Sequence, residues 1–127
     1  MPIPKYRSKF EAYTISALER NKGFEVEYET EKWKYTIPAS DHTYTPDVKI
    51  IFPSGHERFV ELKGKLDIPT RKKMVLIREQ YPDKDIRILF MRNNKLTKTS
   101  KTTYMEWAAK VGYISAVGTI PKAWLVE

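Results

Sequence analysis

The chain has 127 residues and a formal net charge of +7, from 23 lysines and arginines against 16 aspartates and glutamates. Hydrophobic residues make up 41% of the sequence, which excludes a disordered chain and suits one globular domain with a modest core. Cysteine is absent, so disulfides, a disulfide-linked partner and thiolate metal sites are excluded.

The N-terminal third predicts one helix followed by two strands. Ser8 and Glu11 form a capping-box pattern that begins a helix, and Gly23 is placed to end it. Apolar and polar residues then alternate from Phe24 to Tyr28 and again from Trp33 to Ile37, which is typical of half-buried strands. These two strands form either a hairpin or two separate extended arms.

Residues 38–46 are polar, begin and end with proline, and show no periodicity. They predict an extended connector, long enough to cross a distance within one subunit or between two. His42 lies in this segment. A hydrogen-bonded loop histidine is favoured over a metal ligand, because no second histidine lies nearby on the same element.

The stretch from Asp47 to Lys63 predicts a β-hairpin with a turn at Pro53–Gly55. Side chains alternate between the two faces of a strand, so Glu61 and Lys63 lie on one face. A three-residue turn places Asp47 directly across from Glu61, whereas an even loop without a bulge sends Asp47 to the other face. The odd loop is favoured because it also gathers an apolar set on the opposite face: Val48, Ile50, Phe52, Val60 and Leu62.

The cluster of Asp47, Glu61 and Lys63 suits metal-assisted chemistry on a phosphodiester. Mg²⁺ takes carboxylate and phosphate oxygens as ligands, and it generates a hydroxide nucleophile and stabilises charge on phosphorus. For Lys63, orienting water and neutralising charge are favoured over acting as a base, because neighbouring carboxylates oppose the depressed pKa that a base needs. The alternative is a surface hairpin with a cross-strand ion pair.

The remaining chain predicts two helices and a strand. Asp67 caps a helix that begins near Pro69 and ends before Pro82, and a strand follows from Ile86 to Phe90. A second capping box, from Thr103 to Glu106, opens a short helix that ends before Gly112, and an apolar tail around Trp124 docks on the body. Together with the hairpin, these elements predict a mixed α/β sheet flanked by helices.

The basic composition favours a polyanionic partner, with nucleic acid ahead of a membrane, over a merely basic soluble protein. Basic residues gather on the helix after Asp67 and in the lysine- and hydroxyl-rich loop that follows the last strand, where they suit backbone phosphates. The alternative for the helix is an ordinary solvated face. The candidate DNA-contacting residues are Arg7, Lys9, Arg71, Lys72, Lys73, Arg78, Lys95 and Lys98.

The chain has no signal-peptide pattern and no apolar run of about 18 residues. We therefore expect an intracellular protein with no membrane partner.

Pro46-Asp47 followed by Glu61-Leu62-Lys63 resembles the motif of nucleases with a restriction-endonuclease-like fold. A wider resemblance, from about Arg7 to Trp124, is to the bacteriophage endonuclease I family, which resolves Holliday junctions. The segments that carry it are Arg7-Ser8 with Glu11, Ile37 to Asp47, Lys72 to Gln80 and Asp85 to Arg87. The resemblance implies host cytoplasm as the location.

The resemblance also implies the site. Asp47, Glu61 and Glu11 would bind metal through their carboxylates and Leu62 through its backbone carbonyl, with Lys63 as the catalytic lysine. The cofactor would be Mg²⁺, for which Mn²⁺ can substitute. Locally, the capping box explains Glu11 without any catalytic role.

The resemblance further implies an intertwined homodimer built from one nuclease domain, 1–127, in each subunit. Residues 1–37 would be exchanged between subunits, 38–46 would form the bridge, and 47–127 would form the catalytic core. Glu11 would complete the site of the other subunit.

Together with the candidate metal site, the resemblance implies a structure-selective endodeoxyribonuclease that resolves four-way and branched DNA junctions by metal-dependent hydrolysis with paired nicks. Two alternatives stay open: a sequence-specific nuclease with the same core, and a DNA-binding module without catalysis.

Overall fold

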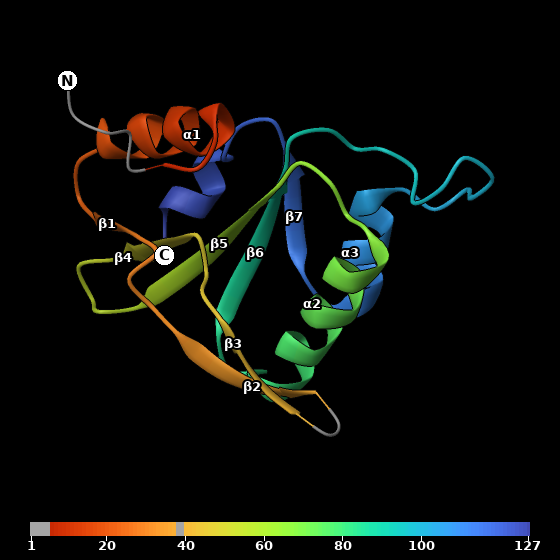
Figure 1. Cartoon of the computed structure of the whole chain (residues 1–127). Coiled ribbons are helices and arrows are strands. Elements are labelled where there is room, and N and C mark those ends of the chain that lie inside the picture. Colours follow the sequence, from red (N-terminus) through yellow and green to blue (C-terminus); the bar gives the residue numbers. More distant parts are fainter. Residues whose placement is uncertain (1–5, 38–39) are drawn as a thin grey trace.

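The computed structural model describes residues 6–37 and 40–127, and contains one five-stranded sheet, one two-stranded sheet and three α-helices (Figure 1). The helices are α1 Lys9–Glu19, α2 Ile68–Gln80 and α3 Tyr104–Val111, with a short 3₁₀ helix η1 at Lys122–Leu125. The strands are β1 Glu25–Tyr28, β2 Trp33–Ile37, β3 Ser40–Tyr44, β4 Val48–Ile51, β5 Glu57–Lys63, β6 Asp85–Phe90 and β7 Ile114–Val117.

The three helices begin where the sequence predicts. The side chains of Ser8, Asp67 and Thr103 each accept a hydrogen bond from a backbone N–H in the first turn, as helix caps do. At α3 the capping box is complete, and Gly112 ends the helix in the left-handed conformation, at φ 108°.

The main sheet has the strand order β1-β4-β5-β6-β7. Strands β1, β4 and β5 pair antiparallel, whereas β5, β6 and β7 pair parallel, so the predicted mixed sheet is confirmed. The helices α2 and α3 connect the parallel strands, as crossover connections in such sheets require.

The strands β1 and β2 do not pair with each other, so the alternative of two separate arms is the correct one. Strand β1 joins the main sheet beside β4, and β2 pairs antiparallel with β3 in a second, two-stranded sheet. Within the predicted extended connector over 38–46, residues 40–44 form the strand β3, which the sequence did not predict; residues 38–39 lie outside the described residues. Edge-to-face packing of Trp33 on Tyr44, at 5.8 Å between ring centroids, helps to hold this hairpin closed.

The β4–β5 hairpin has the predicted register. Val48 lies opposite Val60 and Ile51 opposite Glu57, and the N–H of Phe52 donates to the carbonyl of His56 at 2.9 Å. Three residues therefore form the turn, and the same register places Asp47 opposite Glu61.

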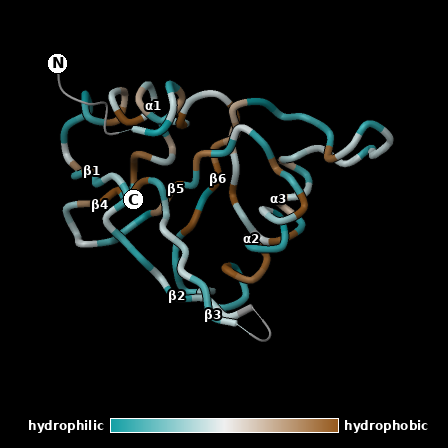
Figure 2. Tube along the Cα trace, viewed as in Figure 1, coloured by the Kyte–Doolittle hydropathy of each residue, from teal (hydrophilic) through white to brown (hydrophobic). Residues whose placement is uncertain are grey.

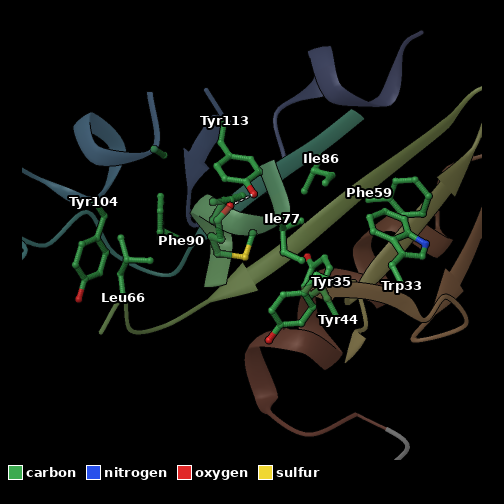
Figure 3. Close-up of a cluster of buried hydrophobic side chains, with 13 residues drawn as sticks. Trp33, Tyr35, Tyr44, Phe59, Leu66, Ile77, Ile86, Phe90, Tyr104 and Tyr113 are labelled. Carbon is green, nitrogen blue, oxygen red and sulfur yellow. Dashed lines mark hydrogen bonds between the residues drawn. The ribbon is translucent and has the colours of Figure 1, made fainter. Parts of the chain in front are cut away.

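The hydrophobic core consists of two clusters, one on each face of the main sheet. On one face, α1 and η1 cover β4 and β5, with Ile15, Leu18 and Trp124 buried against the predicted apolar set. On the other face, α2 and α3 pack against β5 and β6, and β6 carries hydrophobic stretches (Figure 2). Aromatic side chains from β2 and β3 complete this cluster (Figure 3). The predicted docking of the tail around Trp124 is confirmed.

Strand β7 was not predicted because its short sequence, Ile-Ser-Ala-Val, does not alternate between apolar and polar residues. It lies at the edge of the sheet, where Ile114 and Val117 are 53% and 39% exposed. Across the described residues, the structure contains no helix of the length and apolar character that crossing a membrane requires.

Candidate active site

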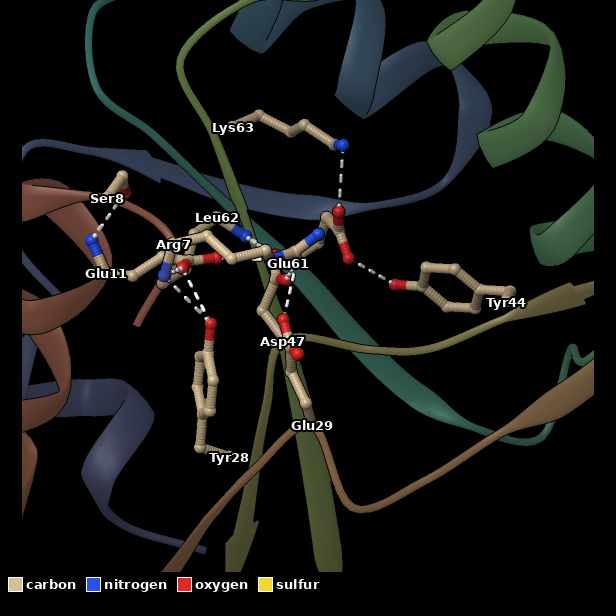
Figure 4. A network of polar contacts seen from close by, with 10 residues as sticks. All are labelled: Arg7, Ser8, Glu11, Tyr28, Glu29, Tyr44, Asp47, Glu61, Leu62 and Lys63. Atoms are coloured by element: carbon tan, nitrogen blue, oxygen red, sulfur yellow. Dashed lines mark hydrogen bonds and ion pairs between the residues drawn. The ribbon is translucent and has the colours of Figure 1, made fainter. Parts of the chain in front are cut away.

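Side chains from three parts of the chain converge on one small cleft (Figure 4). Glu11 comes from the first turn of α1, Asp47 precedes β4, and Glu61 and Lys63 lie near the end of β5. The cleft has a volume of about 300 Å³ and is lined by Arg7, Ser8, Glu11, Asp47, Glu61, Leu62, Lys63, Gly64 and Lys65. The structure thus brings together all of the predicted catalytic residues within a single chain.

Asp47 is buried, with 3% of its surface exposed, and each of its oxygens has a donor. The backbone N–H of Leu62 donates to Oδ2 at 2.8 Å, and Arg7 Nη2 donates to Oδ1 at 2.9 Å. Burial and the nearby Glu61 carboxylate nevertheless raise the pKa of Asp47 to about 8. Because both causes disfavour the ionised form, a cation placed beside Asp47 would relieve them.

Glu61 lies between a tyrosine and the candidate catalytic lysine. Its Oε1 accepts from the buried Tyr44 hydroxyl at 2.7 Å, and its Oε2 pairs with Lys63 Nζ at 3.0 Å. Burial alone would lower the pKa of Lys63, but the charge and hydrogen bond of Glu61 outweigh it and raise that pKa. The raised pKa supports a charged Lys63 that positions or neutralises, in preference to a Lys63 that acts as a base.

Glu11 is 6% exposed and only partly fulfils its capping role. Its N–H donates to Ser8 Oγ at 3.1 Å, but its carboxylate turns into the cleft. There Oε1 accepts from the Arg7 N–H and from the Tyr28 hydroxyl, each at 2.7 Å. Burial and this bond raise the pKa of Tyr28 to about 12, so the hydroxyl remains a donor.

Glu29 is a further acidic residue that the sequence reasoning missed. Its N–H donates to the Asp47 carbonyl at 3.0 Å, just beyond the paired residues of β1 and β4, and its φ of 52° is left-handed. One oxygen each from Glu11, Glu29 and Asp47 lie within 4.8 Å of one another. The signal that could have revealed it is the pairing of β1 with β4, which the sequence alone does not specify.

This group of three carboxylates suits a hard divalent cation, because Mg²⁺ and Mn²⁺ prefer oxygen ligands. Among the residues predicted to bind metal, Glu11 and Asp47 belong to the group, whereas Glu61 faces Lys63 and Tyr44 instead. Each carboxylate oxygen keeps a further lone pair, so these bonds leave Glu61 able to coordinate. Leu62 lines the same cleft, and the metal role of its carbonyl stays a prediction.

The residues predicted to contact DNA lie in several places. Arg71, Lys72 and Lys73 line a wide groove of about 1110 Å³ between α2 and the β2–β3 hairpin, while Lys95 and Lys98 are exposed on the loop after β6. Lys9 is exposed at the start of α1, beside the cleft residue Arg7.

Arg78, also predicted to contact DNA, is already engaged. It donates to the carbonyls of Tyr81, Pro82 and Lys84, so a phosphate would compete with these bonds. His42 shares a hydrogen bond of 2.9 Å with Ser40 Oγ, which agrees with the hydrogen-bonded alternative.

Comparisons with known proteins cover nearly the whole chain. The family model described as Phage endonuclease I matches residues 2–127. Endonuclease I of Escherichia phage T7 is 46% identical over 126 residues, which are 98% of this chain and 81% of that protein. Endodeoxyribonuclease 1 of Enterobacteria phage T3 is 44% identical over 123 residues, 96% of this chain and 78% of that protein. Among solved structures, a repair endonuclease from Pyrococcus abyssi superposes with a TM-score of 0.41 and 17% identity, over 93% of this chain and 49% of that one.

Proposed function

The chain belongs to the phage endonuclease I family, and from this membership we propose that it is an endodeoxyribonuclease that resolves four-way and branched DNA junctions by paired nicks. The observation that carries the proposal is the convergence of Asp47, Glu61 and Lys63 in one cleft. The acidic residue, the leucine and the lysine lie in sequence on β5, which is a central strand of the sheet. We propose that this sheet is the restriction-endonuclease-like core.

The cofactor of this proposal is Mg²⁺, with Mn²⁺ as a substitute. Asp47, Glu11 and the Leu62 carbonyl would hold it, together with Glu61. A divalent cation bound there supplies charge stabilisation at the phosphoryl oxygens and lowers the pKa of the attacking water. The donor set supports this choice, since carboxylate and carbonyl oxygens are the ligands of hard cations.

The side chains of the chain itself supply positioning and charge. Lys63, charged and tied to Glu61 Oε2, presents an ammonium to the phosphate or the water beside it. Tyr44 fixes the other oxygen of Glu61 from within the core, so the carboxylate and the ammonium keep one orientation. The Leu62 N–H orients Asp47 in the same way. Such preorganisation is what a phosphodiester transition state requires.

Selectivity for DNA shape fits the distribution of positive charge. The loop after β6 projects from the body (Figure 1), and it carries Lys95, Lys98 and Lys101. An isolated bridge between Lys95 and Thr103 and a hydrogen bond from the Leu96 N–H to the Thr102 carbonyl order its base. Cations at two separate places can contact two arms of a branched duplex through phosphates, which position a protein without reading bases.

The homodimer of this proposal exchanges residues 1–37 between subunits through the β2–β3 hairpin. Opening this hairpin would let residues 1–37 cross to the second subunit, and the contacts of Glu11 would then form with Asp47 of the partner.

The test of the proposed function is incubation with a four-way junction and a matched linear duplex, with and without Mg²⁺. Cleavage of the junction alone, dependent on Mg²⁺, supports the proposal. Asp47→Ala and Lys63→Ala should abolish cleavage while junction binding persists. Loss of binding in both variants would favour a DNA-binding module or a structural role, and equal cutting of one sequence in both substrates would favour a sequence-specific nuclease.

The exchange has a separate test. A heterodimer of one Glu11→Ala subunit and one Asp47→Ala subunit regains one site with both carboxylates if the sites are shared between chains. It should then nick a junction once, whereas each homodimer stays inactive. Activity no higher than that of the homodimers contradicts the sharing of Glu11.

A further inference from the structure

A single side-chain nitrogen stands among the three carboxylates of the candidate metal group. Arg7 Nη2 lies 2.6 Å from Glu29 Oε2, 2.9 Å from Asp47 Oδ1 and 3.5 Å from Glu11 Oε2 (Figure 4). The same three residues offer the oxygens that lie within 4.8 Å of one another. The guanidinium thus already bridges the acidic group that suits a divalent cation.

The attachment of Arg7 differs from that of a structural arginine. Its side chain is 68% exposed, so apart from its tip it is held by little packing, whereas the side chain of Arg58 is only 6% exposed. The backbone of Arg7 is fixed, because its N–H donates to Glu11 Oε1 at 2.7 Å. The side chain can therefore swing out of the cleft about a fixed Cα, at little cost in buried apolar surface.

We propose that the Arg7 guanidinium is an internal counter-ion that holds the three carboxylates together in the metal-free protein and leaves when a divalent cation is bound. This inference rests on the proposed function, because it assumes that the carboxylates bind metal. Arg7 is then a positioning residue rather than a catalytic one. It keeps Glu11, Glu29 and Asp47 from repelling one another without metal, and it competes with the metal for their oxygens.

The displacement of Arg7 by metal bears on the prediction, made from the sequence, that Arg7 contacts DNA. In the structure Nη2 is engaged by carboxylates and is not available to a phosphate. Once released, the guanidinium remains at the edge of the cleft, where its planar fork suits a phosphate. Metal loading would thus make a phosphate-binding group available in the same event.

The test compares the Mn²⁺ affinity of the full chain with that of Arg7→Gln, by calorimetric titration. The apparent Mn²⁺ affinity scales with the fraction of molecules in which the site is free of the competing guanidinium. If Arg7 blocks the site in about nine molecules of ten, Arg7→Gln should bind Mn²⁺ about tenfold more tightly. Lys65→Gln is the matched control, because it removes an exposed positive charge from the same cleft. It should leave the affinity within about twofold of wild type, since screening weakens an exposed charge.

Thermal unfolding supplies a second readout, in which Arg7→Gln should lose stability in EDTA although it gains Mn²⁺ affinity. In EDTA, Arg7→Gln should unfold about 4 °C below wild type, because the carboxylates lose their counter-ion. In saturating Mn²⁺ the two proteins should unfold at the same temperature. An equal loss of unfolding temperature in EDTA and in Mn²⁺ would overturn the displacement of Arg7 by metal. A gain in Mn²⁺ affinity no larger than that of Lys65→Gln would overturn it too.

The outcomes also separate this inference from the proposed function. If wild type binds no Mn²⁺, the metal site itself is refuted. If wild type binds Mn²⁺ and Arg7→Gln has the same affinity, only the displacement of Arg7 by metal is refuted. Should Arg7→Gln not fold in EDTA, folding restored by Mn²⁺ supports the inference. Should it fold in neither condition, Arg7→Lys decides. Its ammonium keeps the charge without the fork, so Mn²⁺ should bind it more tightly than wild type, and unchanged affinity would overturn the inference.

Discussion

Two charged clusters lie near opposite ends of strand β5, and their charges are balanced in opposite ways. Near the start of β5, one carboxylate, Asp85, is surrounded by three basic side chains. Near its end, four carboxylates share the candidate active site with two paired cations, Arg7 and Lys63. The same strand therefore carries one cluster that contains more basic than acidic groups and one that contains more acidic than basic groups.

The Asp85 cluster stabilises the fold. Arg58 Nε lies 2.6 Å from Asp85, and Arg58 Nη1 donates to the carbonyls of Trp124 and Val126, so this buried arginine fastens the C-terminal segment to the sheet. Burial works against the ionised form of Asp85, but its hydrogen bonds to Arg58, His56 and Arg87 outweigh burial and lower its pKa.

The Asp47 cluster is the reverse case, because burial and neighbouring acids raise the pKa of Asp47 to about 8. Such an arrangement costs stability in the absence of a ligand. The comparison teaches that a perturbed carboxylate marks function when its surroundings disfavour its charge, and stability when its surroundings favour it. The largest effects are expected when the central carboxylate of each cluster, Asp47 or Asp85, is replaced.

Replacing the central acid of the active site, as Asp47→Asn, should lower junction cleavage by at least about 10³-fold. The same change should stabilise the metal-free protein at pH 8.5 by about 2 kcal/mol, because it removes a buried charge that wild type must ionise at that pH. Cleavage assays and urea unfolding in EDTA measure the two effects. A variant that is both inactive and less stable would show that Asp47 holds the fold, and would break the comparison.

The corresponding change in the stabilising cluster, Asp85→Ala, should cost about 3 kcal/mol of unfolding free energy, since it leaves the buried Arg58 without its carboxylate. Cleavage per folded molecule should be unchanged. Asp83→Ala, at an exposed position in the turn before β6, is the matched control and should stay within about 0.5 kcal/mol. Urea unfolding at pH 7 measures both, and equal effects of the two variants would contradict the role of Asp85.

The pH dependence of metal binding should report the raised pKa of Asp47. The metal competes with the proton on Asp47, so Mn²⁺ affinity should fall about tenfold for each pH unit below 8 and level off above it. Calorimetry in buffers of different ionisation enthalpy measures the released proton. An affinity that does not change between pH 6 and 8 would show that Asp47 is already ionised.

The same raised pKa determines how the free energy of unfolding in EDTA changes with pH. Because its folded pKa is raised, Asp47 stabilises the folded state fully below its unfolded pKa, and that contribution is lost as pH rises towards 8. The Asp85 contribution has the opposite sign, since its folded pKa is lowered: it is present above the unfolded pKa and is lost in acid as pH falls through the folded one.

The smallest expected effect is that of Tyr44→Phe. It removes the hydroxyl that donates to Glu61 Oε1 and should lower stability by about 1 kcal/mol, with cleavage reduced about fivefold as Glu61 and Lys63 lose a fixed orientation. Tyr104→Phe, in the same aromatic core, is the control for loss of a ring hydroxyl. Similar cleavage by the two variants would mean that Tyr44 serves only packing.

The sequence predicted the half of the site that lies within one hairpin. Alternation in β4 and β5 and a three-residue turn were sufficient to set Asp47 opposite Glu61, because one register alone buries all the apolar residues. The family resemblance, which is confirmed, added Glu11. No local pattern distinguishes that residue from an ordinary capping glutamate, since it performs half of the capping box as well.

The other half of the site depends on pairings between strands distant in sequence. Glu29 lies near Glu11 and Asp47 only because β1 pairs with β4, and the alternating glutamates of β1 do not indicate which strand lies beside them. Residues 40–44 read as a connector because only their pairing with β2 makes them a strand. Pairing partners are tertiary information, so periodicity predicts that a strand exists without predicting its neighbour.

The hydrogen bond from the Leu62 N–H to Asp47 Oδ2 makes one backbone amide a spectroscopic probe of the site. An amide proton that donates to a carboxylate changes its chemical shift when the carboxylate gains or loses a proton. The nitrogen–proton NMR signal of Leu62 should therefore trace the titration of Asp47, and its displacement by added cation, without any label in the cleft and without DNA.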